Sequence, residues 1–240
     1  MKLTDFKALS FDCYGTLIDW ESGMLEALKP LTSRVALKLT RDEILQAHAR
    51  HESAQQIETP AKLYRDLLPI VYRRLAEEWA APASWSECVA YGRSVPNWPA
   101  FADSAEALNY LKRHYKLIIL SNVDNASFSA SNEKLQVDFD AVYTAEDIGS
   151  YKPSSRNFEY MLSKLATLGL EKGQLLHTAE SLFHDHGPAN AHGLASAWIH
   201  RRHEQEGFGA TMTPGQMPKY DFRFNSLADL VKAHREQLAG

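Results

Sequence analysis

Short apolar runs alternate with longer helical segments along this chain, and that rhythm constrains the fold more than any other feature. The runs cover residues 7–11, 116–120, 141–144, 175–178 and 196–200. Between them lie segments of helical periodicity at residues 104–114, 125–135, 157–168 and 186–192. Strands that alternate with helices pair in parallel through right-handed crossovers. The sequence therefore predicts an α/β fold with a doubly wound parallel sheet.

The stretch between the first two predicted strands breaks this alternation. Residues 41–56 and 61–78 show amphipathic helical patterns with no strand between them, and prolines 60, 82, 96 and 99 lie near their edges. We expect residues 20–97 to form an all-helical cap, and residues 1–19 with 98–240 to form a discontinuous core. Such an insertion would lie over the carboxyl ends of the strands, where open α/β sheets bind ligands. A helical subdomain with packing duties alone is the alternative.

Charge and cysteine content exclude several classes of protein. The formal net charge is -4 and the pI about 6.2, which is unlike the basic excess of nucleic-acid-binding proteins. The two cysteines, Cys13 and Cys88, cannot form a disulfide framework. No apolar run approaches the ~18 residues of a membrane span. We expect a cytoplasmic protein with no nucleic-acid or membrane partner, and the chain is compatible with a homodimer.

Polar residues follow four of the predicted strands. Asp12 ends the first strand, Ser121 and Asn122 end the second, and Lys152 follows the third. Residues 180–185 follow the fourth and contain two acids. The carboxyl ends of parallel strands meet at one edge, so these groups would share a crevice. Asp12 would be a nucleophile, Lys152 a cation that keeps it ionised, and Ser121 and Asn122 donors for an anionic substrate group.

These motifs resemble the haloacid dehalogenase (HAD) superfamily. The resemblance rests on 11–17 (Phe-Asp-Cys-Tyr-Gly-Thr-Leu), 120–122 (Leu-Ser-Asn), 151–153 (Tyr-Lys-Pro) and the acidic segment that ends at Asp185. It spans nearly the whole chain, and it implies a Rossmann-like core with a helical cap. It further implies that Asp12 attacks the substrate to form a covalent intermediate.

Tyr14 decides which branch of the superfamily the motif resembles most. Phosphatase members carry a second aspartate at this place as the general acid. A phenol, with an unperturbed pKa near ~10, is a poor substitute. The Asp-x-Tyr-Gly-Thr form is similar to that of the (S)-2-haloacid dehalogenases, which implies displacement at the carbon beside a carboxylate and no magnesium or other cofactor. The substrate would be a small carboxylic or amino acid, held by Thr16 and the backbone near Tyr14 and walled by Trp20.

The chain departs from the dehalogenase pattern at three places. Glu180 lies at a position where those enzymes have an uncharged residue, and Asp185 lies four residues beyond Ser181. The arginine with which those enzymes bind the halide has no clear counterpart in this sequence. Arg50 is the nearest candidate for that arginine; an exposed place in a helical charge pattern is equally expected. Asp185 would contribute to substrate binding, anchor its loop or orient Lys152.

A second carboxylate beside the leaving group would repel a halide and attract an ammonium. Glu180 therefore makes ring opening of L-azetidine-2-carboxylate to 4-amino-2-hydroxybutyrate the leading hypothesis, and the chain is similar in motif pattern to hydrolases with that activity. Two alternatives for Glu180 are a hydrogen bond to Lys152 and the position of a vestigial metal ligand. (S)-2-Haloacid dehalogenation is the closest rival, and a small-molecule phosphatase is the third. The intact Asp12, Lys152 and Ser121 argue against a non-catalytic interaction protein.

Overall fold

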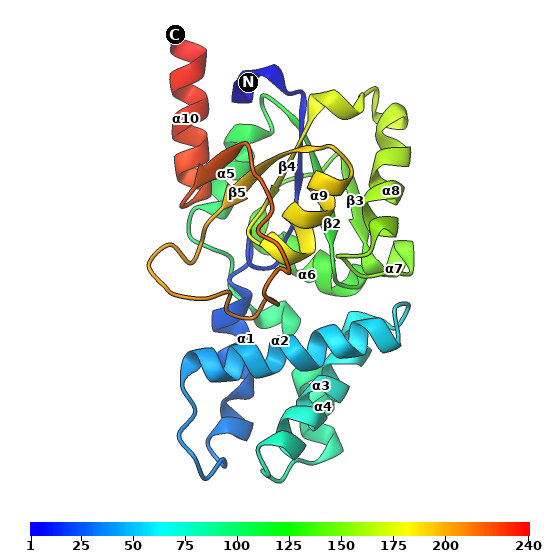
Figure 1. Ribbon diagram of the computed structural model, residues 1–240, viewed down its shortest axis with the longest axis vertical. Coiled ribbons are helices and arrows are strands. Elements are labelled where there is room, and N and C mark those ends of the chain that lie inside the picture. Colours follow the sequence, from blue (N-terminus) through cyan, green and yellow to red (C-terminus); the bar gives the residue numbers. More distant parts are fainter.

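A six-stranded parallel sheet lies at the centre of the computed structural model, which describes residues 1–240 (Figure 1). The strand order is β3-β2-β1-β4-β5-β6, and every neighbouring pair is parallel. The predicted α/β class and parallel sheet are confirmed. The strands are β1 (Ala8–Phe11), β2 (Lys116–Ser121), β3 (Ala141–Thr144), β4 (Leu175–Ala179), β5 (Ala195–Ile199) and β6 (Phe222–Phe224).

The sixth strand was missing from the prediction. β6 is a three-residue edge strand whose side chains are half-buried or exposed, so it has no continuous apolar run to recognise. The five predicted strands all occur, with bounds that shift by a residue or so at their ends. β1 lies between β2 and β4, which places the end of β1 at the point where the strand order reverses.

Both faces of the sheet are covered by helices, as the continuous apolar strands predict. Along β2, Leu117 and Ile119 belong to the larger hydrophobic cluster, while Ile118 and Leu120 belong to a smaller one on the opposite face. The helices outside the insertion are α5 (Ser104–Leu111), α6 (Asn125–Leu135), α7 (Ala145–Ile148), α8 (Ser155–Lys164), α9 (Gly187–Ala191) and α10 (Leu227–Ala239). None of the helices is long and apolar enough to span a bilayer.

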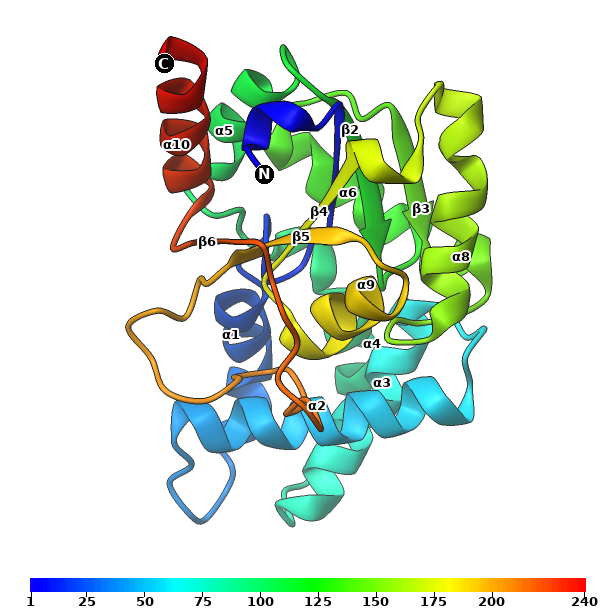
Figure 2. The same cartoon turned by 45° about the horizontal axis from the view of Figure 1, so that its top comes forward.

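The segment 20–97, called the cap below, contains helices and no strand. Its helices lie together beyond the carboxyl ends of the strands (Figures 1 and 2). The chain enters and leaves the cap side by side, because the amide of Asp19 donates to Pro99 O (2.8 Å) and that of Phe101 to Leu17 O (3.0 Å). The cap helices are α1 (Trp20–Thr32), α2 (Arg41–Glu58), α3 (Tyr64–Glu78) and α4 (Trp85–Gly92), followed by the 3₁₀ turn Val95–Asn97.

Candidate active site

Asp12 lies directly after β1, in the middle of the sheet edge that faces the cap. Its backbone amide donates to Thr178 O (3.1 Å), which continues the ladder between β1 and β4 by one residue. Thr16 donates to one carboxylate oxygen, with 2.9 Å between Oγ1 and Oδ2, and Lys152 Nζ lies 2.9 Å from the other. Between Asp12 and Thr16 the chain turns back at Gly15, whose φ of 95° favours glycine. Both carboxylate oxygens are therefore fixed before any substrate binds.

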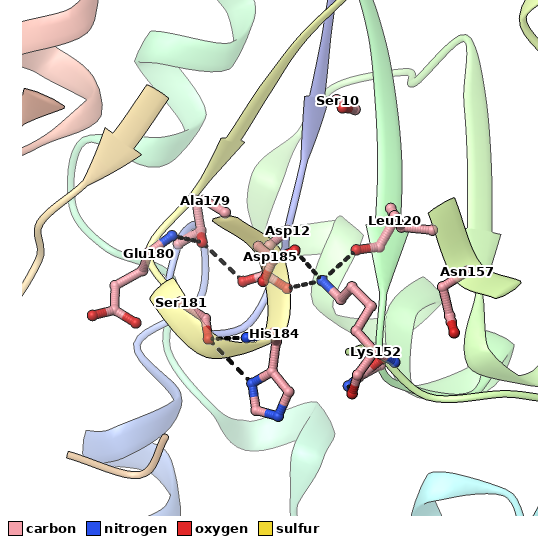
Figure 3. A network of polar contacts seen from close by, with 12 residues as sticks. Ser10, Asp12, Leu120, Lys152, Asn157, Ala179, Glu180, Ser181, His184 and Asp185 are labelled. Atoms are coloured by element: carbon pink, nitrogen blue, oxygen red, sulfur yellow. Dashed lines mark hydrogen bonds and ion pairs between the residues drawn. The ribbon is translucent and has the colours of Figure 1, made fainter. Parts of the chain in front are cut away.

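Lys152 is almost completely buried, with 1% of its surface exposed. Its ammonium donates three hydrogen bonds, to Asp12 Oδ1, to Asp185 Oδ1 (2.7 Å) and to Leu120 O (2.8 Å). A buried ammonium is stable only when such partners satisfy it. Figure 3 shows this ammonium between the two carboxylates and the β2 carbonyl. The predicted crevice does bring Asp12 and Lys152 together.

Asn122 holds the backbone of Lys152 in place. Its side-chain amide donates to Lys152 O (2.9 Å), and its carbonyl accepts from Lys152 N (2.7 Å). Asn122, predicted as a donor to the substrate, lines the cavity described below, and its side-chain amide has a second N–H besides the one that bonds Lys152 O. Ser121 differs, because its hydroxyl is buried and has no hydrogen-bond partner. A buried hydroxyl without a partner is uncommon in folded proteins.

Asp185 anchors the other side of the lysine. It lies in the π-helical turn Leu182–His186 that follows β4, and His177 Nε2 contacts its Oδ1 at 2.9 Å. On the far side of that ring, Nδ1 lies 2.9 Å from the Ser10 hydroxyl. Asp185 thus orients Lys152, one of the roles predicted for it, through a chain of contacts that runs back into the sheet.

One ammonium serves two buried carboxylates, and this sets their pKa values apart. Burial raises the pKa of Asp12, the negative charge of Asp185 adds to that effect, and the ion pair with Lys152 opposes it. Burial also disfavours the charged form of Asp185, but Lys152 and the hydrogen bond from His177 outweigh it and hold the pKa of Asp185 below its usual range. The two carboxylates together keep the pKa of Lys152 raised despite its burial.

A small cavity of about 30 Å³ lies over Asp12, between the core and the cap. That volume has room for about two water molecules. The core side of its lining contains Asp12, Tyr14, Asn122, Val123, Lys152, Ser181, His184 and Asp185; the remaining residues are Trp20, Glu52, Gln56, Tyr64 and Thr211. Trp20, predicted as a wall of the pocket, is in that lining. Glu52 and Thr211 are not among the residues that sequence reasoning selected.

The inner face of α2 is polar because it forms the roof of this cavity. His48, Glu52 and Gln56 are all buried, and Gln56 Nε2 donates to Glu52 Oε1 (3.2 Å). Burial raises the pKa of Glu52 to about 7 and lowers that of His48 to about 3. The four-residue spacing of these three side chains is the signal that could have identified them, since it places them on one face of a helix.

Tyr14 cannot act as the acid that a phosphatase needs. Its hydroxyl lies 2.7 Å from Ser131 Oγ and 3.2 Å from Ser127 O, both on α6. Burial raises the pKa of the phenol well above its ordinary value. Tyr14 therefore lines the cavity with its ring while its proton is bound elsewhere.

Three residues predicted for the substrate site, Thr16, Glu180 and Arg50, are not in the lining of the cavity over Asp12; the Thr16 hydroxyl instead bonds Asp12 and accepts from the amide of Glu180. The carboxylate of Glu180 is directed away from Asp12 and Lys152 (Figure 3), and Glu180 lines a separate cavity of about 290 Å³ with Arg41, Arg201 and Arg202. Local sequence placed Glu180 at the correct edge but could not give its direction. Arg50 lies on the outer side of α2, where its exposed guanidinium pairs with Glu78 Oε1 at 2.8 Å. The charge-pattern alternative for Arg50 is the observed one.

The residues around Asp12 do not form a recognisable cation site. No group of three or more histidine, cysteine, aspartate or glutamate side chains is placed to hold a metal ion. Asp12 and Asp185 each direct an oxygen at the Lys152 ammonium, which supplies the positive charge between them. Glu180, whose carboxylate points away, does not add a third ligand.

The fold matches solved structures along almost its whole length. An L-2-haloacid dehalogenase, PA0810, has 23% sequence identity and a TM-score of 0.72, covering 98% of this chain and 100% of its own. The L-2-haloacid dehalogenase from Xanthobacter autotrophicus, solved with chloropropionic acid covalently bound, has 20% identity and a TM-score of 0.73, covering 96% and 98%. The magnesium-bound putative HAD-hydrolase YfnB from Bacillus subtilis has 16% identity and a TM-score of 0.72, covering 96% and 99%.

Among curated proteins, none shows significant sequence similarity to this chain. A family model described as haloacid dehalogenase-like hydrolase matches residues 6–197. That range includes the motif around Asp12, the cap and the segment around Asp185. The match covers most of the chain and agrees with the resemblance seen in the motifs, so the protein belongs to the haloacid dehalogenase-like hydrolases.

Proposed function

We propose that this hydrolase displaces a leaving group from C2 of a short carboxylic acid through an ester on Asp12. The carboxylate of Asp12 attacks C2, and the bond to the leaving group breaks with its electron pair going to the departing atom. Water then adds to the carboxyl carbon of Asp12, which releases a 2-hydroxy acid and regenerates the aspartate. C2 is inverted in the first step and untouched in the second.

The geometry around Asp12 is the observation that carries this proposal. Thr16 and Lys152 hold one oxygen each, so the carboxylate is oriented and kept ionised while it faces the cavity. A phosphatase would need an acid two residues further on, and Tyr14 is tied to α6 instead. Phosphate-ester hydrolysis is therefore the third candidate.

Charge in the cavity favours a cationic leaving group. Once Asp12 has become an uncharged ester, the lining still contains the acids Glu52 and Asp185 against the single cation Lys152, beside the substrate's own carboxylate, and Glu52 with a pKa of about 7 is partly ionised at neutral pH. Burial also lowers the pKa of His184, on the same lining, to about 4, so its ring is neutral at neutral pH. An expelled halide would face net negative charge at low dielectric, whereas an amine would be stabilised.

Ring opening of L-azetidine-2-carboxylate fits this chemistry best. Its ring nitrogen is a protonated secondary amine, and it would depart as a neutral primary amine that then takes up a proton. Glu52, rather than Glu180, is the carboxylate placed to favour it. The Ser121 hydroxyl has no partner in the protein but does not line the cavity, so Asn122, which does line it, is the predicted donor that would bind the substrate carboxylate. (S)-2-Haloacid dehalogenation by the same steps is the second candidate, and the names of the structural neighbours favour it.

Three probes separate the candidates. Purified protein would be incubated with L-azetidine-2-carboxylate, (S)-2-chloropropionate and p-nitrophenyl phosphate, each with and without EDTA. We expect 4-amino-2-hydroxybutyrate from the first, unchanged by EDTA. Chloride release without ring opening would refute the amine leaving group. Phosphate release that depends on magnesium would refute displacement at carbon altogether.

A single turnover in ¹⁸O-water tests the covalent step. The ester is cleaved at the aspartyl carbon, so the label should appear in the peptide that contains Asp12 and be absent from the product. Asp12→Asn should abolish the reaction in freshly prepared, non-deamidated protein. Label in the product of the first turnover would make water the nucleophile.

A further inference from the structure

A loop from the far end of the chain reaches the active site. It connects β5 to β6, and its orange trace runs beside α1 toward α2 (Figures 1 and 2). The part that matters, residues 202–211, is called the strap below. Both of its ends are buried, with Arg202 5% and Thr211 7% exposed. Thr211 lines the cavity over Asp12, so a segment of the core closes one side of the site below the cap.

The strap is fastened to two cap helices. The Arg202 guanidinium donates to Glu21 Oε2 on α1 (2.5 Å) and to Asp42 Oδ1 on α2 (3.0 Å). The backbone amide of Ala210 donates to the other oxygen of Glu21 (3.2 Å). Bonds to buried charged groups are stronger than neutral ones. Each end of the strap is thus attached to the same buried carboxylate of the cap.

Gly209 allows the strap to lie this close to Glu21; the contact between the strap and Glu21 is called the seat of the strap below. A Cβ there would overlap Glu21 Oε1 and lie 2.6 Å from Arg202 Nη1, so a side chain at this point would displace the two groups that fasten the strap. Gly207 has the same left-handed backbone, with a φ of 72° against 58° for Gly209, but a Cβ there would meet nothing within 4 Å. Replacing either glycine by alanine strains the backbone in the same way, but only at position 209 would the added Cβ meet Glu21 and Arg202. The two glycines therefore make a matched pair of sites for substitution.

We propose that the strap completes the substrate site: Thr211 is a substrate-contact residue that contributes to specificity, and Arg202 is the positioning residue that holds it against the cap. The inference takes the cavity over Asp12 as the substrate site, as proposed above. That cavity has room for about two water molecules. Because the bonds from Arg202 to Glu21 and Asp42 join the core to the cap, they hold the strap, and with it Thr211, at the edge of this cavity.

The glycine pair tests the seat of the strap without any substrate. Gly209→Ala should speed amide hydrogen exchange at residue 210 by about tenfold, because the bond from that amide to Glu21 is lost. Gly207→Ala should leave that exchange within about twofold of wild type. Equal exchange in the two variants would overturn the proposed seat.

Thr211 is tested by removing its hydroxyl while keeping its shape. Thr211→Val should raise the KM for the substrate that the protein turns over by about tenfold, the scale of one lost hydrogen bond to a charged group. Thr211→Ser should restore it, and exchange in the strap should stay as in wild type. An unchanged KM in Thr211→Val, or a raised KM with faster exchange, would refute the contact. If wild type turned over none of the three probes, the proposed function would fail, and the hydrogen-exchange comparison would still decide the strap's seat.

Discussion

Glu52 is costly to keep ionised, and replacing it by glutamine exposes that cost. The carboxylate is buried, and its pKa rises from 4.5 to about 7. A raised pKa means that the native state binds the proton more tightly than the unfolded chain does. Native stability is therefore unaffected by this group below pH 4.5, and it falls as the pH rises from there to 7. At pH 8 the loss is about 3 kcal/mol, because each pKa unit corresponds to ~1.4 kcal/mol.

Glu52→Gln removes this penalty but keeps an oxygen that accepts from Gln56. We expect the variant to be more stable than wild type by about 3 kcal/mol at pH 8 and by less than about 1 kcal/mol at pH 5. Urea unfolding at both pH values measures the difference. Glu78→Gln, on the outer side of the cap, is the matched control and should change stability by less than about 0.5 kcal/mol at either pH.

The same substitution should lower ring opening of L-azetidine-2-carboxylate, because the cavity loses the charge that favours an ammonium. Relative activity on (S)-2-chloropropionate should rise. A variant that gained stability equally at both pH values, or lost it at pH 8, would refute the assignment of the raised pKa to burial. Unchanged preference between the two substrates would refute the role of Glu52 in selecting the leaving group.

Three further predictions concern the ion pairs. Lys152→Met should abolish activity and cost about 3–5 kcal/mol in urea unfolding at pH 7, since it leaves two buried carboxylates without their cation; activity within about tenfold of wild type would refute the role of the lysine. The raised pKa of Asp12 places the acid limb of kcat/KM above pH 3.8, because activity is lost as the pH falls through the native pKa. Asp185→Asn should move that limb to lower pH, since Asp185 contributes to the rise; a limb that stayed in place or moved upward would contradict the shared-cation account. Arg50→Gln should leave kcat and KM within about twofold of wild type in steady-state assays, as its guanidinium pairs with Glu78 outside the cavity; a large KM effect would return it to the site.

The central part of the site could be predicted from the sequence because it depends on local features. Each apolar run specifies a buried strand, and the polar residue after it must leave the sheet at the carboxyl edge. That was sufficient to bring Asp12, Lys152 and Asp185 together, although they are far apart in the chain. The parallel class of the sheet follows from the same alternation.

Directions and long-range contacts required the tertiary structure. Glu180 has its backbone at the predicted edge, but its carboxylate enters a second cavity, since one rotation about a side-chain bond is not encoded in strand periodicity. Glu52 reaches the site because the cap folds back over the sheet, and Thr211 because a loop beyond β5 is fastened to Glu21. The sequence by itself determined that Asp12 and Lys152 lie together at the carboxyl edge of the sheet. The folded chain decided which other groups face them, because burial of charge and close packing act between segments with no local signal in common.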